Sequence, residues 1–208
     1  MTIRKKPLII EFTGPPNSGK TTLVNFLHDV LSKCNYSVEI KQEDAELVPK
    51  SIPKKTWARN AWITLGQLQS LIEVNYSTSD VVLIDRGYYD SLFWPNLLKL
   101  QGVCSEQDCL SAINIIRGLD SQFNFKPDYL FVIDVSTEVS LKRRYAMENS
   151  EAVVLSTNSF IDLYKEQLDV FCEKYKTETS IFKLDTSGLT FVEMQNIVLN
   201  KVSSILKC

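Results

Sequence analysis

A stretch with two glycines and one lysine, residues 14–22, carries the clearest chemical pattern in the sequence. It reads Gly-Pro-Pro-Asn-Ser-Gly-Lys-Thr-Thr and matches G-x-x-x-x-G-K-S/T between an apolar run and a helical pattern. Glycine lets the backbone wrap closely around a phosphate, so that successive N–H groups and a helix N-terminus point at the anion. The pattern predicts a phosphate-binding loop whose nucleotide-binding residues are Gly14, Pro15, Pro16, Asn17, Ser18, Gly19, Lys20, Thr21 and Thr22.

Two side chains of this loop predict the cofactors. Lys20 is placed to reach the β- and γ-phosphates, and the Thr21 hydroxyl is placed to ligate Mg²⁺. We therefore expect ATP and Mg²⁺, although the pattern leaves open whether GTP replaces ATP. Such a loop serves ATPases, GTPases, kinases and motors alike, so the reaction must be argued from other residues.

A second polar group follows the apolar run at 81–84. Asp85 and Arg86 come directly after it, and Asp90 follows four residues after Arg86. A carboxylate here can hold Mg²⁺, and an arginine can bind a phosphate or carboxylate with two hydrogen bonds. We expect Asp85 to join Thr21 at the metal and Arg86 to take part in catalysis. The alternative is an ion pair between Asp85 and Arg86 that only closes a strand.

The elements that position these residues alternate along the chain. Apolar, β-branched runs predict strands at 8–13, 36–40, 81–85, 129–134 and 180–184. Helical periodicity predicts helices at 20–32, 56–75, 88–100, 106–121, 137–148, 159–175 and 191–206. The alternation requires crossover connections, so the expected fold is α/β: a three-layer αβα arrangement of the phosphate-loop NTPase type with a five-stranded parallel sheet. We expect one domain over residues 1–208, with ligands at the carboxyl ends of the strands.

Composition and charge exclude several classes of function. The 208 residues are 44% apolar and 23% charged, and the formal net charge is -2, so neither a nucleic-acid polymer nor an anionic membrane is expected as partner. The apolar runs are far shorter than the roughly 20 residues of a membrane span. Five cysteines without a C-x-x-C pair, and a single histidine, argue for free thiols in the cytoplasm and against zinc or histidine chemistry.

The sequence resembles a known group of kinases. Asp85-Arg86 followed by Asp90-Ser91-Leu92 resembles the acid–arginine signature of thymidylate kinases and deoxynucleoside kinases. Residues 128–144 resemble their fourth strand and the entry to their lid, and residues 184–188 resemble the loop that lies along adenine. The resemblance spans residues 8–206 and implies a short lid, a nucleoside or nucleotide acceptor and a possible homodimer.

The resemblance also implies where cations and adenine lie. Arg143 and Arg144 would lie near a lid formed by residues 147–158, and Asp185 would lie along adenine. Catalysis needs cations around the γ-phosphoryl oxygens, because the transition state spreads negative charge over them. Neighbouring residues on a helix point in different directions, so we expect one of the two arginines to contact phosphate. The alternative is that both belong to a solvated helix face.

The acceptor is expected opposite ATP, between the helices at 56–75 and 88–100. Deoxynucleoside kinases place a glutamate near residues 41–46 to accept the proton of the attacking hydroxyl, and we prefer Glu43 for this role, with Asp44 next. Aromatic residues nearby suit a flat ring held by stacking and one side-chain amide, or else they pack in the core. The expected acceptor-binding residues are Glu43, Trp57, Arg59, Gln67, Arg86, Tyr89 and Asp90.

Together these patterns predict an ATP-dependent phosphotransferase. Its predicted acceptor is a small molecule, most simply a nucleoside or a nucleoside monophosphate. Two alternatives stay open: a regulatory or switch ATPase that responds to its nucleotide, and a kinase of a non-nucleotide metabolite or an antibiotic.

Overall fold

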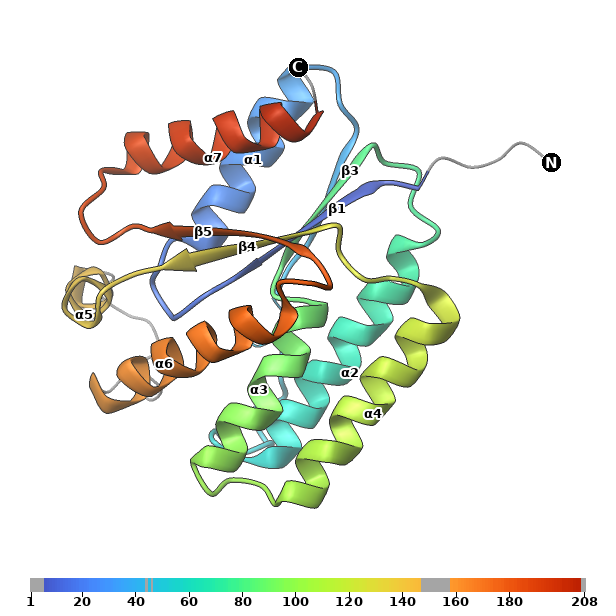
Figure 1. The fold of residues 1–208 in the computed structure, drawn as a ribbon, viewed down its shortest axis with the longest axis vertical. Helices are drawn as coiled ribbons and strands as arrows, with labels where there is room; N and C mark the ends of the chain where they lie inside the picture. The colour runs from blue at the N-terminus through green and yellow to red at the C-terminus, as the bar shows by residue number, and fades with distance from the viewer. Residues whose placement is uncertain (1–5, 44, 46, 147–157, 207–208) are drawn as a thin grey trace.

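The computed structural model describes residues 6–43, 45, 47–146 and 158–206. Its centre is a parallel sheet of order β2-β3-β1-β4-β5 (Figure 1). The strands are β1 (Leu8–Thr13), β2 (Val38–Lys41), β3 (Val81–Asp85), β4 (Tyr129–Asp134) and β5 (Ser180–Asp185). The described helices are α1 (Lys20–Lys33), α2 (Trp57–Val74), α3 (Tyr88–Leu100), α4 (Glu106–Phe123), α5 (Thr137–Ala146), α6 (Asn158–Tyr175) and α7 (Phe191–Leu206).

The sheet separates two helical layers, as Figure 1 shows. Side chains alternate across each strand, so Ile9 packs with α2, α3, α4 and α6, whereas Ile10 and Phe12 pack with α1 and α7. This confirms the predicted α/β fold with a five-stranded parallel sheet between helices. No helix among the described residues is long and apolar enough to span a membrane.

The element boundaries differ from the predicted ones for local reasons. Strand β2 begins at Val38 because the Tyr36 N–H donates back to the Leu31 carbonyl and continues the end of α1. Helix α4 runs on to Phe123, where Asn124 adopts a left-handed conformation with φ 49° and ends it. The helix predicted to reach residue 148 is described through Ala146. Of the predicted lid at 147–158, residues 147–157 lie outside the described residues, and Asn158 is the first residue of α6.

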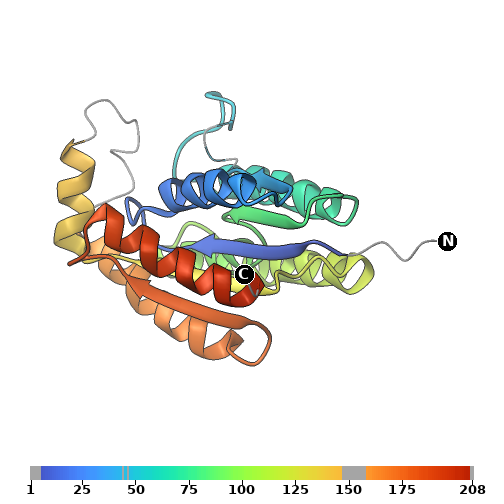
Figure 2. The same cartoon turned by 90° about the horizontal axis from the view of Figure 1, so that it is seen from above.

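The ends of the strands bring four loops to one edge of the sheet. The Arg86 N–H, after β3, donates to the Phe12 carbonyl at 3.0 Å. The Thr186 N–H, after β5, donates to the Asp134 carbonyl at 2.9 Å. Seen from above, α5 lies beyond the carboxyl end of β1 (Figure 2). Polar residues that follow β1, β3, β4 and β5 therefore share one site.

Candidate active site

The predicted phosphate-binding loop connects β1 to α1, and its backbone is unusual at both ends. Gly14 has φ 143°, and a Cβ there would lie 2.0 Å from the Ile133 carbonyl oxygen, so only glycine lets the loop leave β1 against β4. Gly19, with φ 100°, is the N-cap of α1. Between them, Asn17 is left-handed with φ 57°. Within the loop Ser18 is fully buried, whereas Thr22 is exposed in the first turn of α1.

Lys20 is the buried cation of this loop. Its Nζ donates to the Pro15 carbonyl at 2.9 Å and to the Ser18 hydroxyl at 3.4 Å. Burial, together with the nearby Arg86 guanidinium, lowers the pKa of Lys20 to about 8. The ammonium group thus lies within the loop and near carboxylates, where added negative charge would stabilise it.

Thr21 and Asp85 meet across α1 and β3, as the sequence predicts. The Thr21 hydroxyl donates to Asp85 Oδ2, while Asp85 Oδ1 is buried without a hydrogen-bond partner. A buried carboxylate oxygen left without a partner is costly, and oxygen atoms are the ligands that Mg²⁺ prefers. These two residues therefore fit a Mg²⁺ site, with Asp85 and Thr21 as the groups that would hold the ion.

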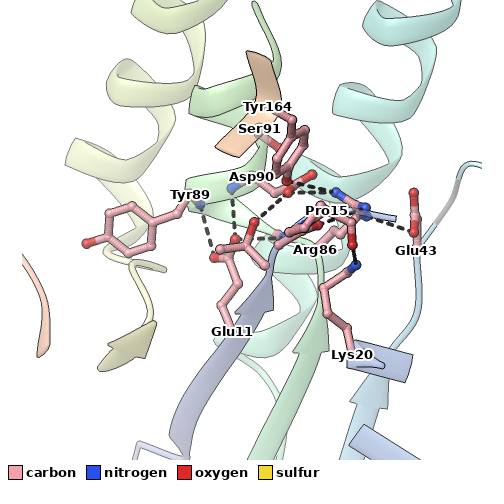
Figure 3. Close-up of polar contacts among 12 residues, drawn as sticks. Glu11, Pro15, Lys20, Glu43, Arg86, Tyr89, Asp90, Ser91 and Tyr164 are labelled. Atoms are coloured by element: carbon pink, nitrogen blue, oxygen red, sulfur yellow. Dashed lines mark hydrogen bonds and ion pairs between the residues drawn. The ribbon is translucent and has the colours of Figure 1, made fainter. Parts of the chain in front are cut away.

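Arg86 connects three parts of the candidate site. It has a left-handed backbone with φ 64° and is 5% exposed. Its Nε donates to Glu43 Oε2 at 2.9 Å, and its guanidinium also donates to Asp90 Oδ1 at 3.0 Å and to the Gly14 carbonyl at 3.3 Å. Figure 3 shows Arg86 between Asp90 and Glu43. Arg86 is thus paired with these two acids rather than in a closed pair with Asp85.

Glu43 is half-buried in the segment that follows β2. Burial raises the pKa of this carboxyl, while Arg86 and Lys20 act in the opposite direction. The carboxylate therefore lies near both cations of the candidate site. Asp44, the other predicted proton acceptor, lies outside the described residues.

Three of the other predicted acceptor-binding residues lie on α2, close to the segment after β2 or to the start of α3. Gln67 is buried and donates to the Arg86 carbonyl at 3.4 Å, and its amide oxygen accepts from the Ser91 hydroxyl at 2.6 Å. Arg59 donates to the Ala45 carbonyl at 2.8 Å, which ties α2 to the segment after β2. Trp57 is half-buried at the first position of α2.

The Tyr89 side chain, which was predicted to bind the acceptor, lies away from Arg86 and the other residues of the candidate site. Its ring lies in the core with edge-on contacts to Tyr88, Phe171 and Tyr175, and Figure 3 shows it pointing away from Arg86. Two other aromatic residues lie near the guanidinium: the Trp94 ring centroid is 5.8 Å from Arg86 Cζ, and the Tyr164 hydroxyl accepts a hydrogen bond from Arg86 at 3.5 Å. The direction of Tyr89 follows from the first turn of α3, which turns this side chain toward α6.

Arg143 contacts the outside of the phosphate-binding loop. Its guanidinium donates to the carbonyls of Asn17 and Ser18, both at 3.3 Å, and to that of Thr186 at 2.9 Å. The group thus holds backbone that shapes the loop. Arg144 is half-buried next to it on α5, and Asp185 accepts hydrogen bonds from the N–H and hydroxyl of Ser187 at the end of β5.

Sequence reasoning missed two residues that shape the site. The Glu11 carboxylate, in the middle of β1, accepts three backbone N–H groups from the start of α3. Burial raises the pKa of this carboxyl, and those donors oppose the rise. The sequence signal that could have identified Glu11 is an acidic residue inside an apolar strand. The Thr186 hydroxyl, fully buried, donates to the Asp134 carbonyl at 2.9 Å and contacts the Ser18 carbonyl at 3.2 Å. Thr186 lies within the resemblance at residues 184–188, but that resemblance gave it no role of its own.

The sheet order, the glycine loop after β1 and the acid–arginine group after β3 define a P-loop nucleotide kinase-like protein. The family model described as chromatin associated protein KTI12 matches residues 6–206, and the chain belongs to this family.

The chain is also similar to one curated protein in sequence and to a group of solved structures in fold. A probable thymidylate kinase from Sulfurisphaera tokodaii is 26% identical over 142 residues, which cover 66% of this chain and 68% of that protein. Structures of deoxyadenosine kinase from M. mycoides with bound dCTP or dATP match with TM-score 0.72 at 16% and 17% identity, over 94% of this chain and 99% of theirs. The second likeness is one of fold.

Proposed function

We propose that this chain transfers the γ-phosphoryl group of ATP to a hydroxyl of a small, uncharged acceptor of the nucleoside class. The observation that carries the proposal is the Glu43 carboxylate, held by Arg86 on the same side of the sheet as Lys20. In the proposed reaction the acceptor oxygen bonds to the γ-phosphorus, the bond to ADP breaks, and the hydroxyl proton passes to Glu43. The relative described as a probable thymidylate kinase supports phosphoryl transfer.

The charges around the site favour a hydroxyl acceptor over a phosphate acceptor. Lys20 and Arg86 lie among three carboxylates, those of Glu43, Asp85 and Asp90. Arg86 is already bonded to Glu43 and Asp90, so its charge is largely balanced within the protein. A phosphate acceptor would bring further negative charge to these acids, whereas a neutral hydroxyl would meet a base.

The remaining groups have proposed roles on the nucleotide side. Lys20 and the loop amides would bind the phosphates, while Arg143 would keep the loop in shape. Thr21 and Asp85 would hold Mg²⁺, which supplies charge neutralisation at the phosphate oxygens. On the other side, Gln67 would fix the backbone of Arg86 and border the acceptor.

Acceptor-dependent ADP release tests the proposal. The protein is incubated with ATP and Mg²⁺ alone, with nucleosides, with nucleoside monophosphates or with other small alcohols, and products are identified by mass spectrometry. We expect ADP release to rise with nucleosides and a phosphorylated nucleoside to appear. Transfer only to monophosphates would contradict the hydroxyl acceptor.

The family match favours a second candidate, a regulatory nucleotide-dependent ATPase, because the family is described as chromatin associated. The same loop, Lys20 and Mg²⁺ ligands would serve slow hydrolysis to ADP and phosphate. The experiment above separates the two functions, since an ADP release rate that no acceptor changes would support this candidate.

Nucleotide binding should be accompanied by proton uptake near pH 8. The pKa of Lys20 is lowered to about 8, so this group is partly neutral there, and a bound triphosphate would raise that pKa and draw in a proton. At about pH 6.5 Lys20 is already protonated and takes up almost none. Calorimetric titration with a non-hydrolysable ATP analogue and Mg²⁺, in buffers of different ionisation enthalpy, measures the uptake. Equal uptake at both pH values would exclude Lys20 as its source.

A further inference from the structure

Glu11 is a charged residue where the fold would ordinarily place an apolar one. It lies in the middle of β1, the central strand, with no exposed surface. A buried carboxylate is costly unless hydrogen bonds stabilise it, and this one accepts three. Oε1 accepts the N–H groups of Gly87 and Asp90 at 3.1 and 2.8 Å, and Oε2 accepts that of Tyr89 at 3.0 Å (Figure 3).

These donors are the first N–H groups of α3, which no earlier turn of the helix can satisfy. The N-cap residue Gly87 has no side chain to bond them. Glu11 therefore caps α3 from another element, because its two oxygen atoms accept N–H groups at the positive end of the helix dipole. The approach is close, since a Cβ on Gly87 would lie 3.3 Å from the Glu11 carboxyl carbon and 2.7 Å from Ile84 Cγ2.

The first turn of α3 carries Asp90, which binds Arg86. β1 holds Asp90 at two points: Glu11 accepts its N–H, and the Thr13 hydroxyl donates to its Oδ1 at 2.8 Å. The same Oδ1 accepts from Arg86, whose Nε bonds Glu43. A continuous chain of hydrogen bonds thus runs from β1 through Asp90 to the proposed proton acceptor.

We propose that Glu11 is a positioning residue, which fixes the start of α3 so that Asp90 sets the direction of Arg86 and, through it, the place of Glu43. This inference rests on the proposed function for its kinetic consequence, but its structural consequence is independent of that function. Glu11 itself touches no reacting group in this scheme. Replacing Glu11 should therefore lower the turnover with the acceptor and leave the binding of ATP unchanged.

Glu11→Gln is the direct test, because the amide keeps the size but places an NH₂ group against at least one N–H donor. We expect kcat to fall about 10- to 100-fold, as for a small misplacement of catalytic groups, with KM for ATP unchanged. Thr13→Val removes the hydrogen bond from the Thr13 hydroxyl to Asp90 without adding a charge, and it should also lower kcat. It also keeps the test open if the Glu11 variant fails to fold. Glu39→Gln, an acid on the edge strand β2, is the matched control.

Two further measurements separate the outcomes. In a cycle of Glu11→Gln with Asp90→Asn, a shared path predicts a double variant much less impaired than the product of the single effects. Crystal structures of the wild type and Glu11→Gln should show the Arg86–Glu43 contact of 2.9 Å lengthened or lost in the variant. If the wild type transfers no phosphoryl group, the proposed function fails while the structural comparison still tests Glu11. A folded variant that keeps both kcat and the Arg86 contacts would overturn the positioning role.

Discussion

Replacement of Lys20 by alanine is expected to lower kcat/KM for phosphoryl transfer by about 100-fold or more, which corresponds to about 3 kcal/mol of transition-state stabilisation. Negative charge develops on the γ-phosphoryl oxygens during transfer, and Lys20 is the cation inside the phosphate-binding loop. Its ammonium group is buried, so its interaction with phosphate oxygens is weakly screened. Initial rates of ADP formation, measured at varied ATP concentration and saturating acceptor, give kcat and kcat/KM.

The control for this variant is Lys33→Ala, at the other end of α1. Lys33 is exposed in the last turn of that helix, at the opposite end from the loop. We expect this variant to keep wild-type turnover. Near-normal turnover in Lys20→Ala would reject the phosphoryl-transfer scheme, because no other group of the loop supplies a cation among residues 14–22.

Glu43→Gln should lower kcat about 100- to 10,000-fold with a hydroxyl acceptor, the range expected when a general base is removed. The amide matches the carboxylate in size but cannot take the hydroxyl proton. Arg86 keeps its bonds to Asp90 and Gly14, so we expect the protein to stay folded and KM for ATP to stay the same. Steady-state kinetics with varied ATP and varied acceptor give the two KM values and kcat.

Glu73→Gln is the matched control for Glu43→Gln. It also removes a carboxylate that pairs with a cation, Lys41, but it does so on the exposed surface of α2. Its turnover should equal that of the wild type. If Glu43→Gln kept full acceptor-dependent turnover, Glu43 would not be the base, and Asp44 would be the next residue to replace.

The geometry of the proposed nucleotide-binding loop was predictable from the sequence because its pattern is local. Gly14, Gly19, Lys20 and Thr21 lie within eight consecutive positions, and the backbone conformation that they require is a property of that short stretch. Asp85 was predictable for a related reason. It ends an apolar strand, and parallel strands bring their carboxyl ends to one edge of the sheet.

The role of Arg143 needed the tertiary structure. Sequence placed it near phosphate as a lid arginine, whereas the structure shows its donors on the carbonyls of the loop and of Thr186. Helical periodicity gives the direction of a side chain relative to its own helix. It does not give the loop that lies opposite, which here comes from β1 and is more than a hundred residues earlier.

The contacts of two buried residues, Glu11 and Tyr89, likewise could not be predicted from the sequence. A carboxylate in an apolar strand indicates an unusual environment, but its partners start a helix more than seventy residues later. Tyr89 stands between residues of the site, yet one helical step turns its ring into the aromatic cluster around Phe171. Spacing along the chain indicated which strand or helix carries each residue. The direction of each side chain depends on how the elements pack against one another.

The tight passage of Gly14 against the Ile133 carbonyl has a consequence for mutational screens. Any larger residue at position 14 would clash with the Ile133 carbonyl oxygen and push β1 away from β4, so we expect folding and the proposed nucleotide binding to be impaired together there. A selection for thermostability and a selection for turnover would therefore reject the same substitutions at position 14. At position 43, which is half-buried, we expect the two selections to differ, because a substitution there would lower turnover with little effect on stability.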